Sequence, residues 1–210
     1  MLESKNIDSA RLGDLCDIVV GMPLSRARRI PESSSGEVVG VITQKTLTAD
    51  GIDLEEVSYE VLGQVRKACI TSPGDVIVKL TTPYDCAYIN SDCAGLLVVS
   101  AAAILRPRTR SVNMRWIAAV LGTPQLKGEL RLASIGASIQ MIKKSGLANL
   151  VIPVPSVEKQ EHVASVHERV ESFKSSCRRS MRLADTFLAA SVSAAAFHNE
   201  DIYSEGNEDI

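Results

Sequence analysis

Positive side chains are concentrated in one stretch of the sequence. Residues 101–150 contain eight lysines and arginines against a single acid, Glu129, a local balance of +7. Residues 1–100 hold nine bases and 14 acids. A cluster of this sign is typical of a surface that binds a polyanion such as nucleic acid. The composition also allows a second interpretation, in which these bases are spread over the fold and pair with the acidic first half.

The residue patterns of common catalytic sites are missing from the chain. It has neither the G-x-x-x-x-G-K-[ST] loop that binds nucleotide phosphates nor the G-x-G-x-x-G loop of dinucleotide sites. It has no G-x-S-x-G motif, and its histidines all come after residue 160. Nucleases usually need clustered carboxylates that hold a divalent ion, and Asp75 in "GDVIVKL" has no acidic neighbour. We therefore predict no catalytic residue.

Cysteine and histidine spacing argues against a metal site. The five cysteines form no C-x-x-C pair, which favours reduced thiols and a cytoplasmic location. His162 and His167 are five residues apart, so they do not share one helical face, and we predict no metal.

No apolar stretch is long enough to cross a membrane, and residues 1–10 have no apolar core of a signal peptide.

Short strands and turns must position any binding residues in the first 155 residues. β-Branched runs predict strands ending at Gly21, across 37–47, at 76–80 and in the run 150–155, and one or two strands within 96–107. Apolar residues at helical spacing predict a helix from Met114 to Leu121, with Gly122 as its stop.

From Ser156 onward the pattern is that of one long helix. Apolar residues recur every three or four positions through about forty residues without proline or glycine. Such a helix would be about 60 Å long, too long to lie wholly on one domain of this size. We therefore expect its apolar stripe to pack on a second chain, most simply a second copy. The residues expected at that contact are Val163, Val166, Val170, Phe173, Met181 and Leu188.

Four segments, in order, resemble the specificity subunits of type I restriction-modification systems. "RLGDL" (residues 11–15) resembles the "LGDL" opening of a target-recognition domain, and "PGDVIV" (73–78) resembles its "GDIL" strand. "GASIQMIKKSGLANLVIPVP" resembles the stretch that closes the domain, and "PSVEKQEHVASV" resembles the "P-x-x-E-Q-x-x-I" start of the spacer helix. One extra residue, Lys159, separates Glu158 from Gln160 in the last segment.

The resemblance implies an α+β fold with three parts. Residues 1–155 would form a DNA target-recognition domain with a small twisted β-sheet or half-barrel and flanking helices. Residues 156–197 would form one long coiled-coil spacer and dimerisation helix, and residues 198–210 a disordered acidic tail. Family members usually carry two such domains and two helices. This chain has one of each and no internal repeat. We expect a natural half-subunit that dimerises; the alternatives are a truncated subunit or a fragment of a larger restriction-methylation enzyme.

The resemblance also implies the partners: double-stranded DNA, a methyltransferase subunit that holds S-adenosylmethionine, and in some systems a restriction subunit. Each domain would read one half of a split DNA site. Polar side chains in the loops are then the candidates for contact with bases and phosphates. These are Arg26, Arg28, Arg29, Gln44, Lys45, Lys79, Thr81, Thr82, Tyr84, Gln140, Lys143 and Lys144.

A second hypothesis of a different class stays open. The chain could be a non-catalytic assembly, regulatory or decoy protein of a defence complex that keeps this fold without reading DNA. For each polar residue alone, an ordinary solvated surface role explains its presence equally well.

Overall fold

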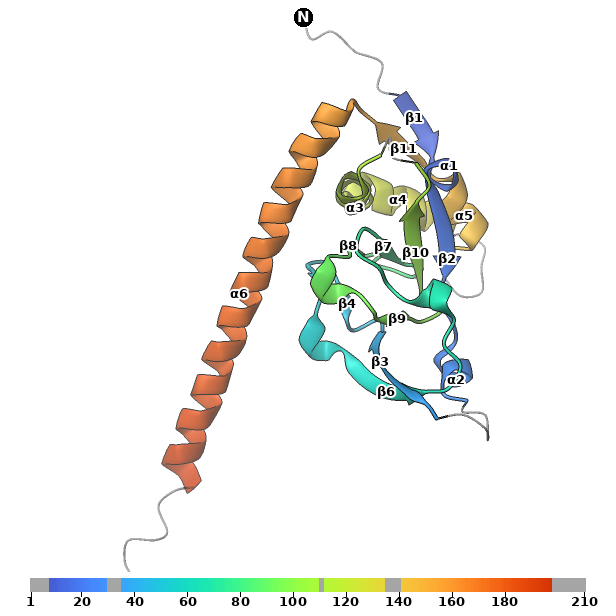
Figure 1. The fold of residues 1–210 in the computed structure, drawn as a ribbon. Helices are drawn as coiled ribbons and strands as arrows, with labels where there is room; N and C mark the ends of the chain where they lie inside the picture. Colours follow the sequence, from blue (N-terminus) through green and yellow to red (C-terminus); the bar gives the residue numbers. More distant parts are fainter. Residues whose placement is uncertain (1–7, 30–34, 110–111, 135–140, 198–210) are drawn as a thin grey trace, which may run out of the picture. The chain divides into compact units, whose positions relative to one another are not determined.

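The structure is a computed structural model that describes residues 8–29, 35–109, 112–134 and 141–197 (Figure 1). Two units are distinguished, residues 1–169 and residues 170–210, so their boundary falls within the last helix. The boundary predicted at residues 155–156 lies just before the first residue of that helix, Val157, whereas the two units divide between Arg169 and Val170. The tail predicted for residues 198–210 lies outside the described residues.

A four-stranded antiparallel sheet forms the centre of the first unit. Its strands, in spatial order, are β2 (Cys16–Val20), β10 (Ala102–Pro107), β7 (Val76–Lys79) and β8 (Cys86–Tyr88). Along β7, Val76 and Val78 enter one hydrophobic core, while Ile77 between them enters another. Because both faces of the sheet are buried here, the run Val76–Val78 of β7 is continuously apolar instead of alternating with polar residues.

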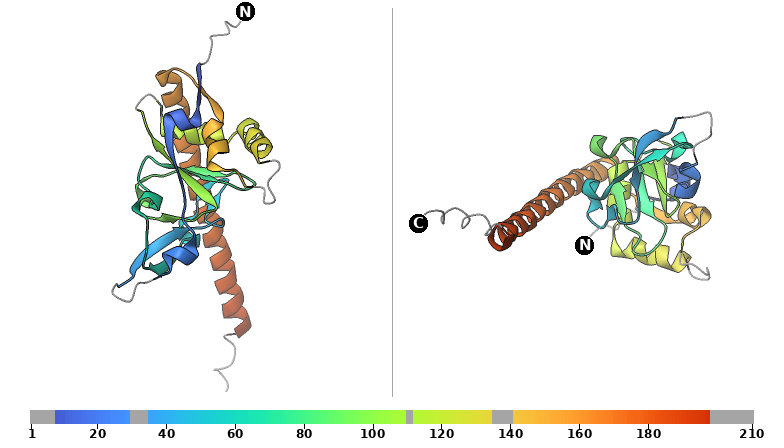
Figure 2. Two further views of the ribbon diagram at one scale, coloured as in Figure 1. Left: turned by 90° about the vertical axis from the view of Figure 1, so that its right-hand side faces the viewer. Right: turned by 90° about the horizontal axis from the view of Figure 1, so that it is seen from below.

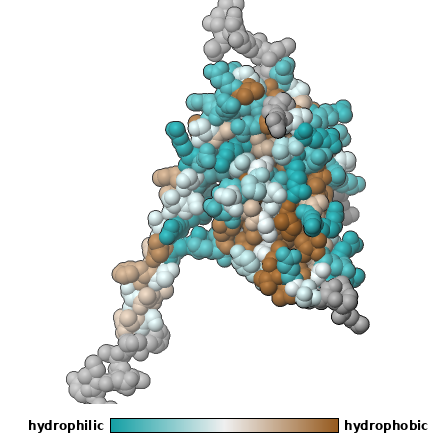
Figure 3. Space-filling model, viewed as in Figure 1, coloured by the Kyte–Doolittle hydropathy of each residue, from teal (hydrophilic) through white to brown (hydrophobic). Residues whose placement is uncertain are grey.

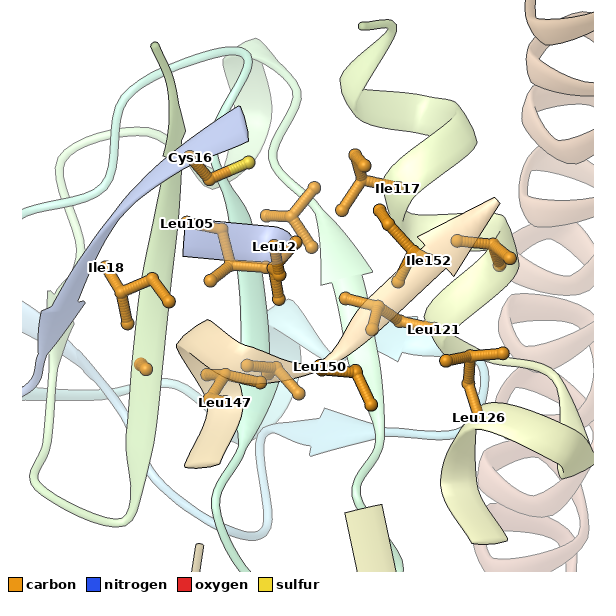
Figure 4. Close-up of a cluster of buried hydrophobic side chains, with 14 of the residues drawn as sticks. Leu12, Cys16, Ile18, Leu105, Ile117, Leu121, Leu126, Leu147, Leu150 and Ile152 are labelled. Carbon is orange, nitrogen blue, oxygen red and sulfur yellow. The ribbon is translucent and has the colours of Figure 1, made fainter. Parts of the chain in front are cut away.

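Helices cover one face of this sheet and enclose the larger core, part of which Figure 4 shows. They are α1 (Leu12–Leu15), α3 (Met114–Leu121), α4 (Pro124–Ala133) and α5 (Lys144–Asn149). The predicted helix 114–121 is confirmed, and Gly122 is its C-cap. Asn113 caps α3 by accepting the N–H of Arg115, and Thr123 caps α4 by accepting the N–H of Leu126.

The other face of the sheet is covered by smaller elements. A three-stranded sheet has the order β6 (Ser58–Leu62), β3 (Glu37–Ile42), β9 (Leu97–Val98), with β3 and β9 parallel. Beside it lie α2 (Leu24–Ala27) and the hairpin of β4 (Leu47–Thr48) with β5 (Gly51–Ile52). Apolar surface gathers around β3 and β6 (Figure 3), where Val38, Tyr59 and Val61 are exposed.

The strand predicted across residues 37–47 is interrupted in the structure. β3 ends at Ile42, and the next strand, β4, begins only at Leu47. The Thr46 hydroxyl accepts the backbone N–H of Thr43 at 2.6 Å and donates to the Thr43 carbonyl at 3.2 Å. These local bonds replace ladder bonds and turn the chain.

A two-stranded antiparallel ribbon brings the first described residues next to residues 151–154. β1 (Asp8–Arg11) pairs with β11 (Val151–Val154), and the left-hand view of Figure 2 shows the two strands side by side. The Leu12 N–H donates to the Leu150 carbonyl at 2.8 Å, and the Trp116 indole N–H donates to the Pro153 carbonyl at 3.0 Å. The segment from Leu12 to Leu150 therefore begins and ends at the same place.

The last helix, α6 (Val157–Phe197), begins where the sequence predicted it. The Ser156 carbonyl accepts the Gln160 N–H at 3.0 Å, which places Ser156 at the N-cap. The Gln160 side chain is 1% exposed; its amide donates to the Pro155 carbonyl at 2.9 Å and accepts the Asn113 N–H at 2.8 Å. Two turns further, Glu168 pairs with Arg115 at 2.9 Å. The first turns of α6 are thus fixed to the rest of the first unit.

Most of the apolar stripe predicted on α6 is exposed. Val163 is half-buried, whereas Val166, Val170, Phe173, Met181 and Leu188 are 45–70% exposed. No helix within the described ranges is both long enough and apolar enough to span a membrane.

Candidate nucleic-acid interface

Three segments that are far apart in the sequence meet at the turn of residues 80–85, between β7 and β8. Thr81 forms an isolated antiparallel bridge with Met141, and the Ile142 N–H donates to the Leu80 carbonyl at 2.8 Å. From a third segment, the Gln44 side-chain amide donates to the Thr81 hydroxyl at 3.4 Å. The structure therefore brings Gln44, Thr81 and the segment leading to Lys143 into one neighbourhood.

The side chains of this neighbourhood point their polar groups outward. Gln44, Lys45, Thr82, Lys143 and Lys144 are exposed, and Thr81 is half-buried. An amide and two hydroxyls offer both donors and acceptors, whereas the ammonium groups offer positive charge. This combination can contact both base edges and phosphates of a duplex. We name these six residues the polar turn surface.

Two predicted DNA-contacting residues of the same region are turned into the protein instead. Tyr84 is 1% exposed, and its hydroxyl donates to the Ser134 hydroxyl at 2.9 Å. The Lys79 ammonium lies 3.1 Å from the Asp85 carboxylate, and the lysine side chain is 11% exposed. Both side chains are therefore largely inaccessible to a duplex, because Tyr84 is packed in the core and Lys79 is paired with Asp85.

The three arginines of the second predicted group lie on or just after α2. Arg26 and Arg29 are exposed. Arg28 forms two hydrogen bonds with Glu60 of β6, at 2.6 and 2.7 Å, and this pairing lowers the pKa of the Glu60 carboxyl. The Ala27 carbonyl accepts the Gly63 N–H at 2.9 Å, so this group lies next to β6. Gln140, the remaining predicted residue, lies outside the described residues.

Several of the bases in residues 101–150 form ion pairs with acids of the same chain. Arg106 pairs with Asp75 at 3.1 Å, Arg108 with Asp17 at 2.8 Å and Lys127 with Asp85 at 2.9 Å. These three acids belong to the acidic first half of the chain. The pairing interpretation therefore holds for these three bases, whereas Arg131, Lys143 and Lys144 remain exposed.

Asp75, the acid considered above for nuclease chemistry, has a structural role. It is 3% exposed, and its carboxylate accepts the Ser72 N–H at 2.9 Å in addition to the Arg106 guanidinium. Among the described residues, no group of histidine, cysteine, aspartate and glutamate is arranged to hold a metal ion.

A hollow of about 480 Å³ lies between α1, α5 and the edge of the central sheet. Its lining brings Lys144 together with Arg106 and Arg108, and Cys16 forms part of its wall. Burial, and to a smaller extent the neighbouring Asp17 carboxylate, raise the pKa of the Cys16 thiol to about 12. The hollow therefore offers no nucleophilic thiolate at neutral pH.

This pKa predicts a large difference in reactivity between two cysteines. At pH 8 about one Cys16 side chain in 10,000 is a thiolate, so Cys16 should resist a disulfide reagent while the exposed Cys177 reacts within minutes. Mass spectrometry of labelled peptides would measure both, and fast labelling of Cys16 in the folded chain would contradict the assignment. Because the unfolded chain loses this proton near pH 9 and the folded chain only near 12, stability should fall as pH rises between these values.

Solved structures with this fold come from type I restriction-modification systems. A chain from a study of complex assembly and conformational transition of a type I R-M system aligns with a TM-score of 0.57 and 19% identity, over 92% of this chain and 45% of that chain. The HsdS subunit from Thermoanaerobacter tengcongensis aligns with a TM-score of 0.56 and 21% identity, over 86% and 41%. The type I S subunit from M. genitalium aligns with a TM-score of 0.51 and 16% identity, over 94% and 49%.

The sequence itself gives no comparable match. No protein-family profile matches it, and no curated protein sequence matches it significantly. The expected α+β fold with a long final helix is confirmed by the structural comparison. The chain therefore has the fold of type I restriction-modification specificity subunits, over slightly less than half of the length of such a subunit.

Proposed function

We propose that this chain is a non-catalytic specificity subunit of a type I restriction-modification or DNA-methylation complex, and that it reads one half of a split DNA site. The observation that carries the proposal is the polar turn surface, which three distant segments build on a specificity-subunit fold. We also propose that two copies of the subunit act together as a dimer. The exposed apolar stripe of α6 supports this part of the proposal.

The proposed contacts with DNA are of two kinds, one that supplies affinity and one that supplies sequence specificity. Lys143 and Lys144 bind phosphates and supply affinity that depends on salt but carries no sequence information. The Gln44 amide and the Thr81 and Thr82 hydroxyls contact base edges in the major groove, where each base pair presents a distinct pattern of donors and acceptors.

The long helix sets the geometry of the complex. Its apolar stripe packs on the same helix of a second copy, and the paired helices set the distance between two half-sites. The pair then recruits methyltransferase subunits, which hold S-adenosylmethionine and perform the chemistry, and in some systems a restriction subunit.

Methylation mapping in a host that carries this chain with a cognate methyltransferase tests the whole proposal. A split palindromic motif is expected if two identical copies read the site, and an asymmetric motif would indicate a second specificity chain. A purified chain that stays monomeric at micromolar concentration and ignores duplex DNA with a methyltransferase present would contradict the proposal.

The phosphate contacts give a quantitative prediction for Lys143→Ala combined with Lys144→Ala. The logarithm of the binding constant falls linearly with the logarithm of the salt concentration, and each phosphate contact makes this slope steeper by about 0.9. The double variant should therefore bind a mixed-sequence duplex more weakly and show a salt slope that is about 1.8 less steep. Fluorescence anisotropy from 50 to 200 mM salt would measure both quantities.

A matched control is Arg66→Ala combined with Lys67→Ala, which removes the same charge from exposed side chains near β6. The control should leave the salt slope close to that of the parent chain. If the Lys143–Lys144 variant also bound like the parent, the polar turn surface would not be the DNA site. The assembly or regulatory function would then be the better explanation.

A further inference from the structure

One buried carboxylate, that of Asp85, joins the turn of residues 80–85 to helix α4. Asp85, the last residue of the turn, is 4% exposed. Its two oxygens bind different lysines: one lies 3.1 Å from the Lys79 ammonium of β7, and the other lies 2.9 Å from the Lys127 ammonium of α4. The Lys79 N–H also donates to the Asp85 backbone carbonyl at 2.8 Å, so both ends of the turn meet at this residue.

A second bond connects the same turn to α4 independently. The Tyr84 hydroxyl donates to the Ser134 hydroxyl, which in turn donates to the Arg131 carbonyl at 2.8 Å near the end of α4. Tyr84 has a φ of 57°, a conformation that non-glycine residues rarely adopt, and its side chain is buried in the larger core. The turn is thus held in one unusual backbone conformation from behind.

Asp85 and Tyr84 are buried, but they belong to the same turn as Thr81 and Thr82, whose side chains are at least partly exposed. Thr81 and Thr82 lie within the same six-residue turn, and Gln44 donates to Thr81 from outside. Hydrogen bonds to base edges discriminate only when their donors and acceptors are fixed in direction. The orientation of the two threonines therefore depends on the bonds behind the turn.

We infer that Asp85 and Lys127 are positioning residues for base reading: their ion pair holds the turn of residues 80–85 against α4, so that Thr81 and Thr82 present their hydroxyls in one orientation. This inference rests on the proposed DNA-reading function. It assigns Lys127 a role distinct from that of Lys143 and Lys144, because Lys127 acts through Asp85 and contacts no phosphate.

Lys127→Met is the variant that separates these roles. It removes the bond to α4 but leaves Asp85 paired with Lys79, so no buried carboxylate loses its only partner. Selection from a library of randomised duplexes, with the methyltransferase present, would measure discrimination between the preferred half-site and its single-base variants. We expect discrimination to fall about tenfold, the size of one lost base contact, while mixed-sequence affinity and its salt slope stay unchanged.

Two further variants complete the experiment. Lys127→Arg keeps the charge and its reach to Asp85 and should restore discrimination. Arg131→Met removes one exposed charge from the same helix and should leave discrimination unchanged. Thermal unfolding of each variant checks that the domain is folded at the temperature of the selection.

The outcomes separate the inference from the function on which it rests. If the parent chain selects a sequence and Lys127→Met selects it equally well, the positioning role is overturned and the proposed function stands. If Lys127→Met flattens the salt slope by about 0.9 and weakens all duplexes alike, Lys127 is a phosphate contact instead. If the parent chain itself selects no sequence, the proposed function fails first.

Discussion

Aspartates at Val170 and Phe173 are expected to weaken strongly the self-association that we propose for the chain. These side chains are 45% and 70% exposed, and both lie on the apolar stripe of α6. Burying a side chain of this kind against a partner helix is worth about 1.5–3 kcal/mol, and a carboxylate at the same place would lose its hydration. Since about 1.4 kcal/mol changes a dissociation constant tenfold, the double substitution should weaken a dimer at least about 100-fold.

Sedimentation velocity across micromolar concentrations would measure the effect. The control is Ser172→Asp combined with Ser175→Asp, which adds the same charge to exposed positions on the opposite face of the helix. The control should associate like the parent chain. A stripe variant that associates as tightly as the parent would show that this stripe is not the contact.

Gly21→Ala is expected to destabilise the fold more than any surface substitution. A β-carbon at Gly21 would lie 2.2 Å from the Val99 carbonyl oxygen and 2.5 Å from that of Val98. Both obstacles are backbone atoms, and neighbouring bonds hold them in place: the Gly21 N–H donates to the Ala102 carbonyl at 3.0 Å, and the Met22 N–H donates to the Val98 carbonyl at 3.1 Å. The clash can be relieved only by separating β2 from the segment between β9 and β10.

The expected loss of unfolding free energy is about 3 kcal/mol or more, at the upper end for overpacked sites. Chemical denaturation would measure it. Gly128→Ala is the matched control, since nothing lies within 4 Å of its added β-carbon and the residue sits inside α4. That substitution should raise stability by about 0.5–1 kcal/mol through helix propensity. Equal stability of the two variants would mean that the chain does not approach Gly21 as closely as described.

The sequence predicted helices and strands well where their formation depends on residues that are close together along the chain. Apolar spacing and Gly122 defined α3, and the proline pair before Ser156 defined the start of α6. The strand across residues 37–47 was only half correct, because the side chain of Thr46 turns the backbone by bonds that apolar periodicity does not reveal.

The candidate site was harder to predict because it depends on pairs that are distant in sequence. Lys79 and Tyr84 look like Thr81 and Thr82 in a polar run, yet two of these four residues face inward. Tyr84 is held by Ser134, 50 positions away, and Lys79 is held by Asp85, which also binds Lys127, 42 positions away from Asp85. Charge counting likewise found the basic segment but not which of its members were already paired.

The ribbon of β1 and β11 has a consequence for the order of events during synthesis. β1 pairs with a strand about 140 residues further along the chain, and β2 pairs with β10 across most of the domain. Contacts of such long range slow folding, because large loops must close before they form. As the chain leaves the ribosome, β1 stays without its partner until β11 has been made. Most of α6 follows only afterwards, so its apolar stripe emerges when the strands needed to close the first unit are already present.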